Sequence, residues 1–166
     1  MAEMKQKIQE DLTAALKEKK ELELSVLRLL NSAIVSKEKI KRYKISKEKP
    51  NLMEAELEKE SELTDEEVLD TISSEVKKRK EAILLFEKGK RMDLLEKEKK
   101  EAEILEKYLP EQFSEEEIKK LVKEAIDKTG AKEIKDMRKI MSELMPKVKG
   151  KADGNLVSKI VKDLLS

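Results

Sequence analysis

Residues 105–118, Leu-Glu-Lys-Tyr-Leu-Pro-Glu-Gln-Phe-Ser-Glu-Glu-Glu-Ile, end one predicted helix and begin another. Pro110 breaks the first helix, because proline lacks a backbone N–H and its ring clashes with the preceding turn. Ser114 and Glu117 then match a capping box, in which each residue satisfies a backbone donor at the start of the next helix. The stretch therefore predicts a boundary between two helical parts of the chain.

Apolar residues recur at helical spacing on both sides of this boundary. Before it, helices are predicted over residues 3–19, about 21–43, from the Thr64 capping box to about Lys88, and from Leu94 to Tyr108. After it, they are predicted over residues 115–128, 136–145 and 154–165, with Pro146 restricting the end of the second. The fold class is all-α, with an N-terminal bundle of about four long helices over residues 1–108 and a C-terminal three-helix module over residues 109–166.

The region between the second and third of the predicted N-terminal helices is acidic. Residues 47–70 carry ten acidic and three basic side chains. Pro50 and weak periodicity favour a mobile linker in the early part, residues 47–63, with a short helix at 53–60. Such a segment would repel phosphate.

Composition excludes several classes of chemistry. The 166 residues include no Cys and no His. Disulfides, thiolate catalysis, Ser-His-Asp triads and His-ligated metal sites are therefore excluded. No apolar run approaches the roughly 20 residues of a membrane span. We expect a soluble cytoplasmic protein with no membrane association, no cofactor, no metal and no catalytic residues of its own.

A basic segment near the C-terminus is the strongest candidate for function. From Lys135 to Lys162 there are eight Lys or Arg against three Asp or Glu, although the whole chain has a net charge of only +1. The predicted nucleic-acid-binding residues are Arg138, Lys139, Lys147, Lys149, Lys151, Lys159 and Lys162. Lysines around a glycine turn can meet successive phosphates. The alternative stays open that Gly150 and Gly154 only let the chain turn and the lysines only keep it soluble.

The start of the last helix is a poorer phosphate site. Asp153 is the expected N-cap, so its carboxylate would occupy the free amide groups and repel an anion. The predicted contact therefore belongs to the lysine side chains.

Three other features have two interpretations each. The basic end of the second helix, residues 37–44, is either a solvated helix terminus or an RNA contact, and the first is favoured. Glu98 and Glu101 are either helix ion pairs, for instance with Arg79 or Arg91, or an acid/base or cation site, and ion pairs are favoured. Tyr108 either wedges the two parts together or stacks on a base, and the wedge is favoured.

The ordered motifs resemble the YqeY family, whose C-terminal module is shared with the tail of GatB, the B subunit of the glutamine-dependent tRNA amidotransferase. The resemblance covers nearly the whole chain and rests on residues 24–28, 80–94, 98–117 and 136–161. Arg138 departs from it, since the family commonly has glycine there. The resemblance implies an association with tRNA. Members of the family are also commonly labelled as carbon-nitrogen ligases with glutamine as amido-N-donor. That activity belongs to the whole amidotransferase.

The sequence thus predicts a non-catalytic accessory protein that binds tRNA or an aminoacyl-tRNA complex through its basic C-terminal module. One alternative is a helical scaffold that pairs with a protein partner through the wide apolar face from Leu22 to Ile34. Another is a component of a carbon-nitrogen ligase.

Overall fold

The computed structural model describes residues 2–165, whose regular structure consists of helices alone. The predicted all-α class is confirmed. Contacts within the chain define two compact units that divide between Tyr108 and Leu109.

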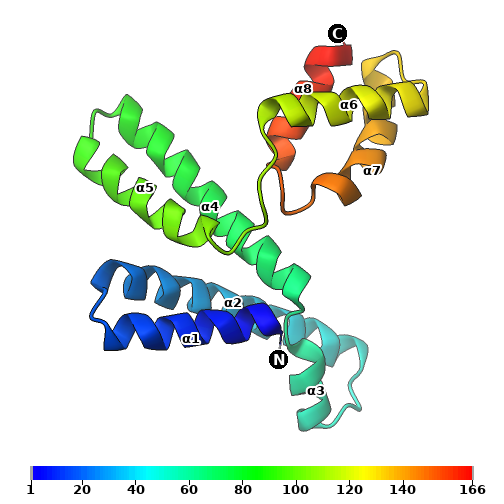
Figure 1. Ribbon diagram of the computed structural model, residues 1–166. Helices are drawn as coiled ribbons and strands as arrows, with labels where there is room; N and C mark the ends of the chain where they lie inside the picture. The colour runs from blue at the N-terminus through cyan, green and yellow to red at the C-terminus, as the bar shows by residue number, and fades with distance from the viewer. Residues whose placement is uncertain (1, 166) are drawn as a thin grey trace. The chain divides into compact units, whose positions relative to one another are not determined.

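The N-terminal unit contains two long helical pairs and one short helix between them (Figure 1). The helices are α1 (Glu3–Lys17), α2 (Glu21–Glu48), α3 (Glu54–Ser61), α4 (Asp65–Lys88) and α5 (Met92–Glu106). Helices α1 and α2 run antiparallel, and α4 and α5 form a second antiparallel pair. Further contacts of α2 with α3, α4 and α5, and of α1 with α4, join these elements into one bundle.

The predicted cap at the start of α4 is present. The Thr64 hydroxyl accepts from the Glu67 N–H at 3.2 Å, and the Glu67 carboxylate accepts from the Thr64 N–H at 2.8 Å. These reciprocal bonds satisfy two donors that the helix itself leaves free. Local sequence is therefore enough to fix where α4 begins.

The apolar face of α2 is largely buried inside the N-terminal unit. Val26, Leu27, Leu30 and Ile34 are all buried. Of the large apolar residues within this stretch, Leu29 is the exposed one. The face from Leu22 to Ile34 thus serves as bundle core, which leaves little of it for another chain.

Helix α2 extends further than its apolar pattern predicts. It was expected to end near Tyr43 and continues to Glu48, so the segment expected as a linker is reduced to a short turn before α3. The short helix expected at 53–60 is confirmed. Ion pairs fold α3 back against the basic end of α2, and they join Arg42 to Glu54 at 2.7 Å and Lys49 to Glu60 at 2.6 Å. The position of α3 therefore depends on charge pairing between helices, which the weak hydrophobic periodicity of this segment could not indicate.

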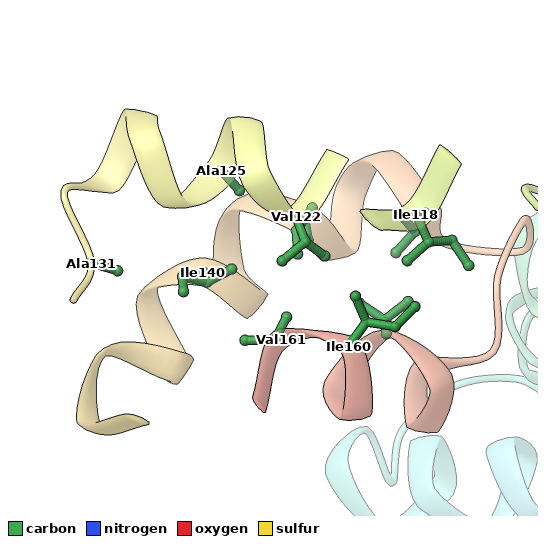
Figure 2. Close-up of a cluster of buried hydrophobic side chains, with 10 residues drawn as sticks. Ile118, Val122, Ala125, Ala131, Ile140, Ile160 and Val161 are labelled. Carbon is green, nitrogen blue, oxygen red and sulfur yellow. The ribbon is translucent and has the colours of Figure 1, made fainter. Parts of the chain in front are cut away.

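The C-terminal unit consists of three α-helices packed around one apolar core (Figure 2). They are α6 (Glu115–Thr129), α7 (Met137–Val148) and α8 (Gly154–Leu165), and a 3-10 turn, Ile134–Asp136, precedes α7. The Ser114–Glu117 capping box starts α6, and Gly130 ends it with φ +67°. That conformation costs glycine little, because glycine has no Cβ.

Pro146 does not end α7, contrary to the prediction. The helix continues to Val148, and the Lys149 N–H donates to the Met145 carbonyl at 3.0 Å. A proline in the last turn removes only its own backbone donor, and buried Val148 anchors that turn in the core. Tertiary packing therefore overrides the local helix-breaking signal.

Candidate nucleic-acid interface

The connection between α7 and α8, residues 149–153, is held by hydrogen bonds to the segment that precedes α6. The Phe113 N–H donates to the Lys151 carbonyl at 2.8 Å, and the Gln112 side-chain amide donates to the Gly150 carbonyl at 2.8 Å. Gly150 adopts φ +73°, which lets the chain reverse. The basic connection is therefore a fixed turn within the C-terminal unit.

Asp153 caps the last helix as predicted. Its carboxylate accepts from the Asn155 N–H at 2.7 Å, and its carbonyl accepts from the Val157 N–H at 3.0 Å. An anion at this helix terminus would compete with a carboxylate already in place. Cations on side chains are the better candidates for a phosphate contact.

All seven predicted binding residues have exposed side chains, but the structure distributes them over three groups. The first is the connection group, Lys149 and Lys151, in the turn itself. The Lys151 ammonium lies 5.5 Å from the centroid of the Phe113 ring. This contact orients one lysine of the turn over an aromatic face.

The second is the acid-paired group, Lys139 and Lys147, on α7. Lys139 lies 3.6 Å from Asp136, and Lys147 lies 3.6 Å from Glu143. Glu143 also accepts a hydrogen bond from Lys128 of α6. These pairs offset part of the positive charge on this side of α7.

The paired carboxylates stay ionised at neutral pH. Lys128 lowers the pKa of Glu143 by hydrogen bonding, and Lys147 adds to the effect. Backbone N–H groups of Lys132 and Glu133, together with Lys139, lower the pKa of Asp136. Phosphate binding at Lys139 or Lys147 would therefore compete with a charged partner.

The third is the seam group, Arg138 of α7 with Lys159 and Lys162 of α8, two helices that contact each other. That contact is marked by Ser158 Oγ, which lies 4.0 Å from Met141 Sδ. Arg138 lies one turn from Met141 and Lys162 one turn from Ser158 along their helices. Arg138 and Lys159 form no ion pair within residues 2–165.

Sequence reasoning missed the role of Gln112 and Phe113 in holding the basic turn. Phe113 also packs against the core of the C-terminal unit. The available signal was its position next to the Ser114 cap, which brings it close to the core. Its second contact depends on a residue 38 positions away and has no local signature.

Glu101 proves to be part of a structural ion pair, as favoured from sequence. It is buried in the α4–α5 pair, where its carboxylate lies 3.3 Å from the guanidinium Nε of Arg79. Arg79 continues the buried stripe of α4 after Val76, a spacing from which its burial could have been anticipated. Within residues 2–165, no group of three or more acidic side chains is arranged to hold a metal ion.

Tyr108 is bonded inside the N-terminal unit. Its hydroxyl donates to Asp11 of α1 at 2.6 Å, and the Lys7 ammonium lies 5.8 Å from its ring centroid. Burial, followed by the bond to Asp11, raises the pKa of Tyr108 far above its ordinary value. A ring held in this way is poorly available for stacking on a base.

Comparison with known proteins gives a family match and one partial relative. A family model described as Yqey-like protein matches residues 45–165. A curated protein of Schizosaccharomyces pombe, described as uncharacterized, is 45% identical over 51 residues. The match covers 31% of this chain and 42% of that relative, so the chain spans less than half of the relative's length.

Every helix within residues 2–165 is too short or too polar to cross a bilayer.

Proposed function

Because this chain belongs to the YqeY family, we propose that it is a non-catalytic accessory protein that binds tRNA or an aminoacyl-tRNA complex through its C-terminal unit. The resemblance to the tail of the tRNA amidotransferase B subunit supplies the ligand class. The observation that carries the proposal is that all seven cations are exposed and belong to the same compact unit.

The connection group and the seam group are the proposed phosphate contacts. Lysine and arginine side chains that meet phosphates fix the position of a nucleic acid without reading its sequence. Each phosphate that is neutralised contributes about −0.7 to −0.9 to the slope of log affinity against log salt. A site of five cations therefore implies weak binding that is lost at moderate salt.

A gel-shift titration with bulk tRNA at low and moderate salt tests the proposal. One test variant changes the connection group, Lys149 and Lys151, together with the nearby Lys147 of α7, to Gln. A second test variant changes the seam group, Arg138, Lys159 and Lys162, to Gln. A matched control changes Lys119, Lys120 and Lys123, which are exposed on α6 of the same unit, to Gln. We expect wild type and the control to shift tRNA equally and both test variants to shift it less.

Two outcomes would contradict the proposal. In the first, wild-type protein fails to shift tRNA even at low salt. In the second, the α6 control loses as much affinity as the test variants, which would indicate a response to net charge without a site. Turnover of glutamine or aminoacyl-tRNA by the purified chain would instead support the enzymatic alternative.

A further inference from the structure

The outward face of the C-terminal half of α2 is basic and carries an exposed aromatic ring. Lys37, Ile40, Tyr43, Lys44 and Lys47 share this face at helical spacing, and we call these five residues the α2 stripe. The three lysines are exposed, Ile40 is 58% exposed and Tyr43 is 64% exposed. The Lys47 ammonium lies 5.5 Å from the centroid of the Tyr43 ring.

Side chains of α2 next to the stripe hold the helix to the rest of the bundle. Glu38 pairs with Lys5 of α1 at 2.7 Å, and Lys41 pairs with Glu67 of α4 at 2.7 Å. Lys41 also donates to the Glu62 carbonyl at 2.8 Å. These contacts draw the carboxylates toward the bundle.

The lysines of the α2 stripe are left facing solvent. None of the three forms an ion pair within the described part of the chain. Glu48 stands beyond them at the end of the helix. Between Lys37 and Lys47 the acidic residue of α2 is Glu38, and its carboxylate is paired with Lys5 of α1.

One edge of the stripe borders an open groove of about 520 Å³ between α2 and α4. Lys37, Ile40, Lys41 and Lys44 line it from α2. Glu67 and Asp70 line it from α4. A ligand seated deep in the groove would meet carboxylates, whereas a ligand along the outer face of α2 would meet the lysines and Tyr43.

We propose that the α2 stripe is a binding surface for single-stranded nucleic acid. Lysines at positions 37, 44 and 47 span about 15 Å along the helix, a length that can follow several phosphates of a strand. Tyr43 lies among them and offers a ring on which a base can stack, a contact that tolerates any sequence. Aliphatic Ile40 adds apolar surface beside that ring.

Other occupants fit the same face less well. A membrane-bound helix requires a broad apolar face, and this one has only Ile40 and Tyr43. An acidic peptide that used the groove would face the carboxylates of Glu67 and Asp70. A polynucleotide on the outer face satisfies both the charge and the exposed ring.

This surface is separate from the lysines of the proposed tRNA site. It belongs to the N-terminal unit, and the family match begins at residue 45, after four of its five residues. The inference therefore does not depend on the proposed function, and the two can fail independently.

Fluorescence anisotropy of a labelled oligouridine of about 15 nucleotides, titrated with the full chain at low salt, tests the proposal. One variant changes Lys37, Lys44 and Lys47 to Gln, and two others carry Tyr43→Ala or Tyr43→Phe. The matched control changes Lys90, Lys99 and Lys100, which are exposed elsewhere in the N-terminal unit, to Gln. Circular dichroism verifies that each variant remains helical.

We expect the α2 triple variant to bind about tenfold or more weakly and its salt slope to fall by about 2, because each phosphate contact in a single strand contributes about 0.7. Tyr43→Ala should weaken binding about tenfold, whereas Tyr43→Phe should retain it because the ring remains. The control and the variant at Lys147, Lys149 and Lys151 should bind oligouridine like wild type.

The proposal is overturned if wild type does not bind the oligonucleotide, if the control variant loses as much affinity as the α2 variant, or if Tyr43→Ala binds unchanged. Binding to vesicles containing phosphatidylserine, without binding to oligouridine, would also overturn it and assign the face to a membrane. Loss of tRNA binding in the C-terminal variants with oligouridine binding intact would separate the two sites.

Discussion

Arg79 of α4 and Glu101 of α5 form an ion pair across the α4–α5 pair, with 3.3 Å between Nε and Oε2 and both residues buried. A second guanidinium nitrogen of Arg79 lies within hydrogen-bonding distance of the carbonyl and the carboxylate of Glu75. Such a pair fixes the register of two helices, because each charge needs its partner once water is excluded.

Removal of one partner from this pair should destabilise the protein. Glu101→Gln removes one of the two carboxylates that face the buried guanidinium of Arg79, and we expect the free energy of unfolding to fall by about 3 kcal/mol. The double change Arg79→Met with Glu101→Leu removes both charges and should recover most of that loss. Urea unfolding followed by circular dichroism measures both effects. Asp93→Asn, in an exposed pair with Arg91, is the control and should have little effect. Equal stability of Glu101→Gln and wild type would show that the pair contributes nothing.

The hydroxyl of Tyr108 should make stability depend on alkaline pH. Its pKa is raised in the folded protein by burial and by Asp11, so the unfolded chain loses this proton first, near pH 10. Below that pH the contribution is fully present, and above it stability should fall by up to about 1.4 kcal/mol per pH unit. Comparison of wild type with Tyr108→Phe between pH 9 and about 11 isolates the effect. Parallel curves for the two proteins would contradict the prediction.

The Ser114 cap should stabilise the C-terminal unit. Its hydroxyl accepts from the Glu117 N–H at 3.3 Å, and Ser114→Ala should lower the free energy of unfolding by about 1 kcal/mol. Ser142→Ala is the matched control, because the Ser142 hydroxyl bonds only to the Arg138 carbonyl within α7 and is exposed. Thermal unfolding of both variants gives the comparison, in which a larger loss for Ser142→Ala would refute the role of the cap.

The turn between α7 and α8 should be sensitive to Gly150 and tolerant at Gly154. At φ +73°, Gly150→Ala places a Cβ in a left-handed conformation and should cost about 1 kcal/mol. Gly154 begins α8, and an added Cβ there meets nothing within 4 Å, so Gly154→Ala should be neutral or slightly stabilising. Urea unfolding of both variants measures the two changes in the free energy of unfolding. Equal changes would show that the backbone conformation at Gly150 does not restrict the residue there.

Sequence reasoning found the start of α4 and α6, because a capping box is complete within four residues. It failed at the end of α2 and at Pro146, where contacts with other helices extend a helix beyond its local signals. The predicted cap at Asp153 was confirmed for the same reason as the others, since its bonds reach only two and four residues ahead.

The sequence by itself determined an all-α chain, the helix caps and the presence of seven exposed cations near the C-terminus, since these follow from local hydrogen bonding and helical periodicity. The pairs of Lys139 with Asp136 and of Lys147 with Glu143 are local, since they span three and four residues. Tertiary structure alone decided that Lys41 pairs with Glu67, that Arg79 pairs with Glu101 and that Lys151 lies over the Phe113 ring. The physical reason is that these contacts join side chains of different segments through space. Residues that lie far apart in the chain carry no local sequence pattern that predicts which of them will meet.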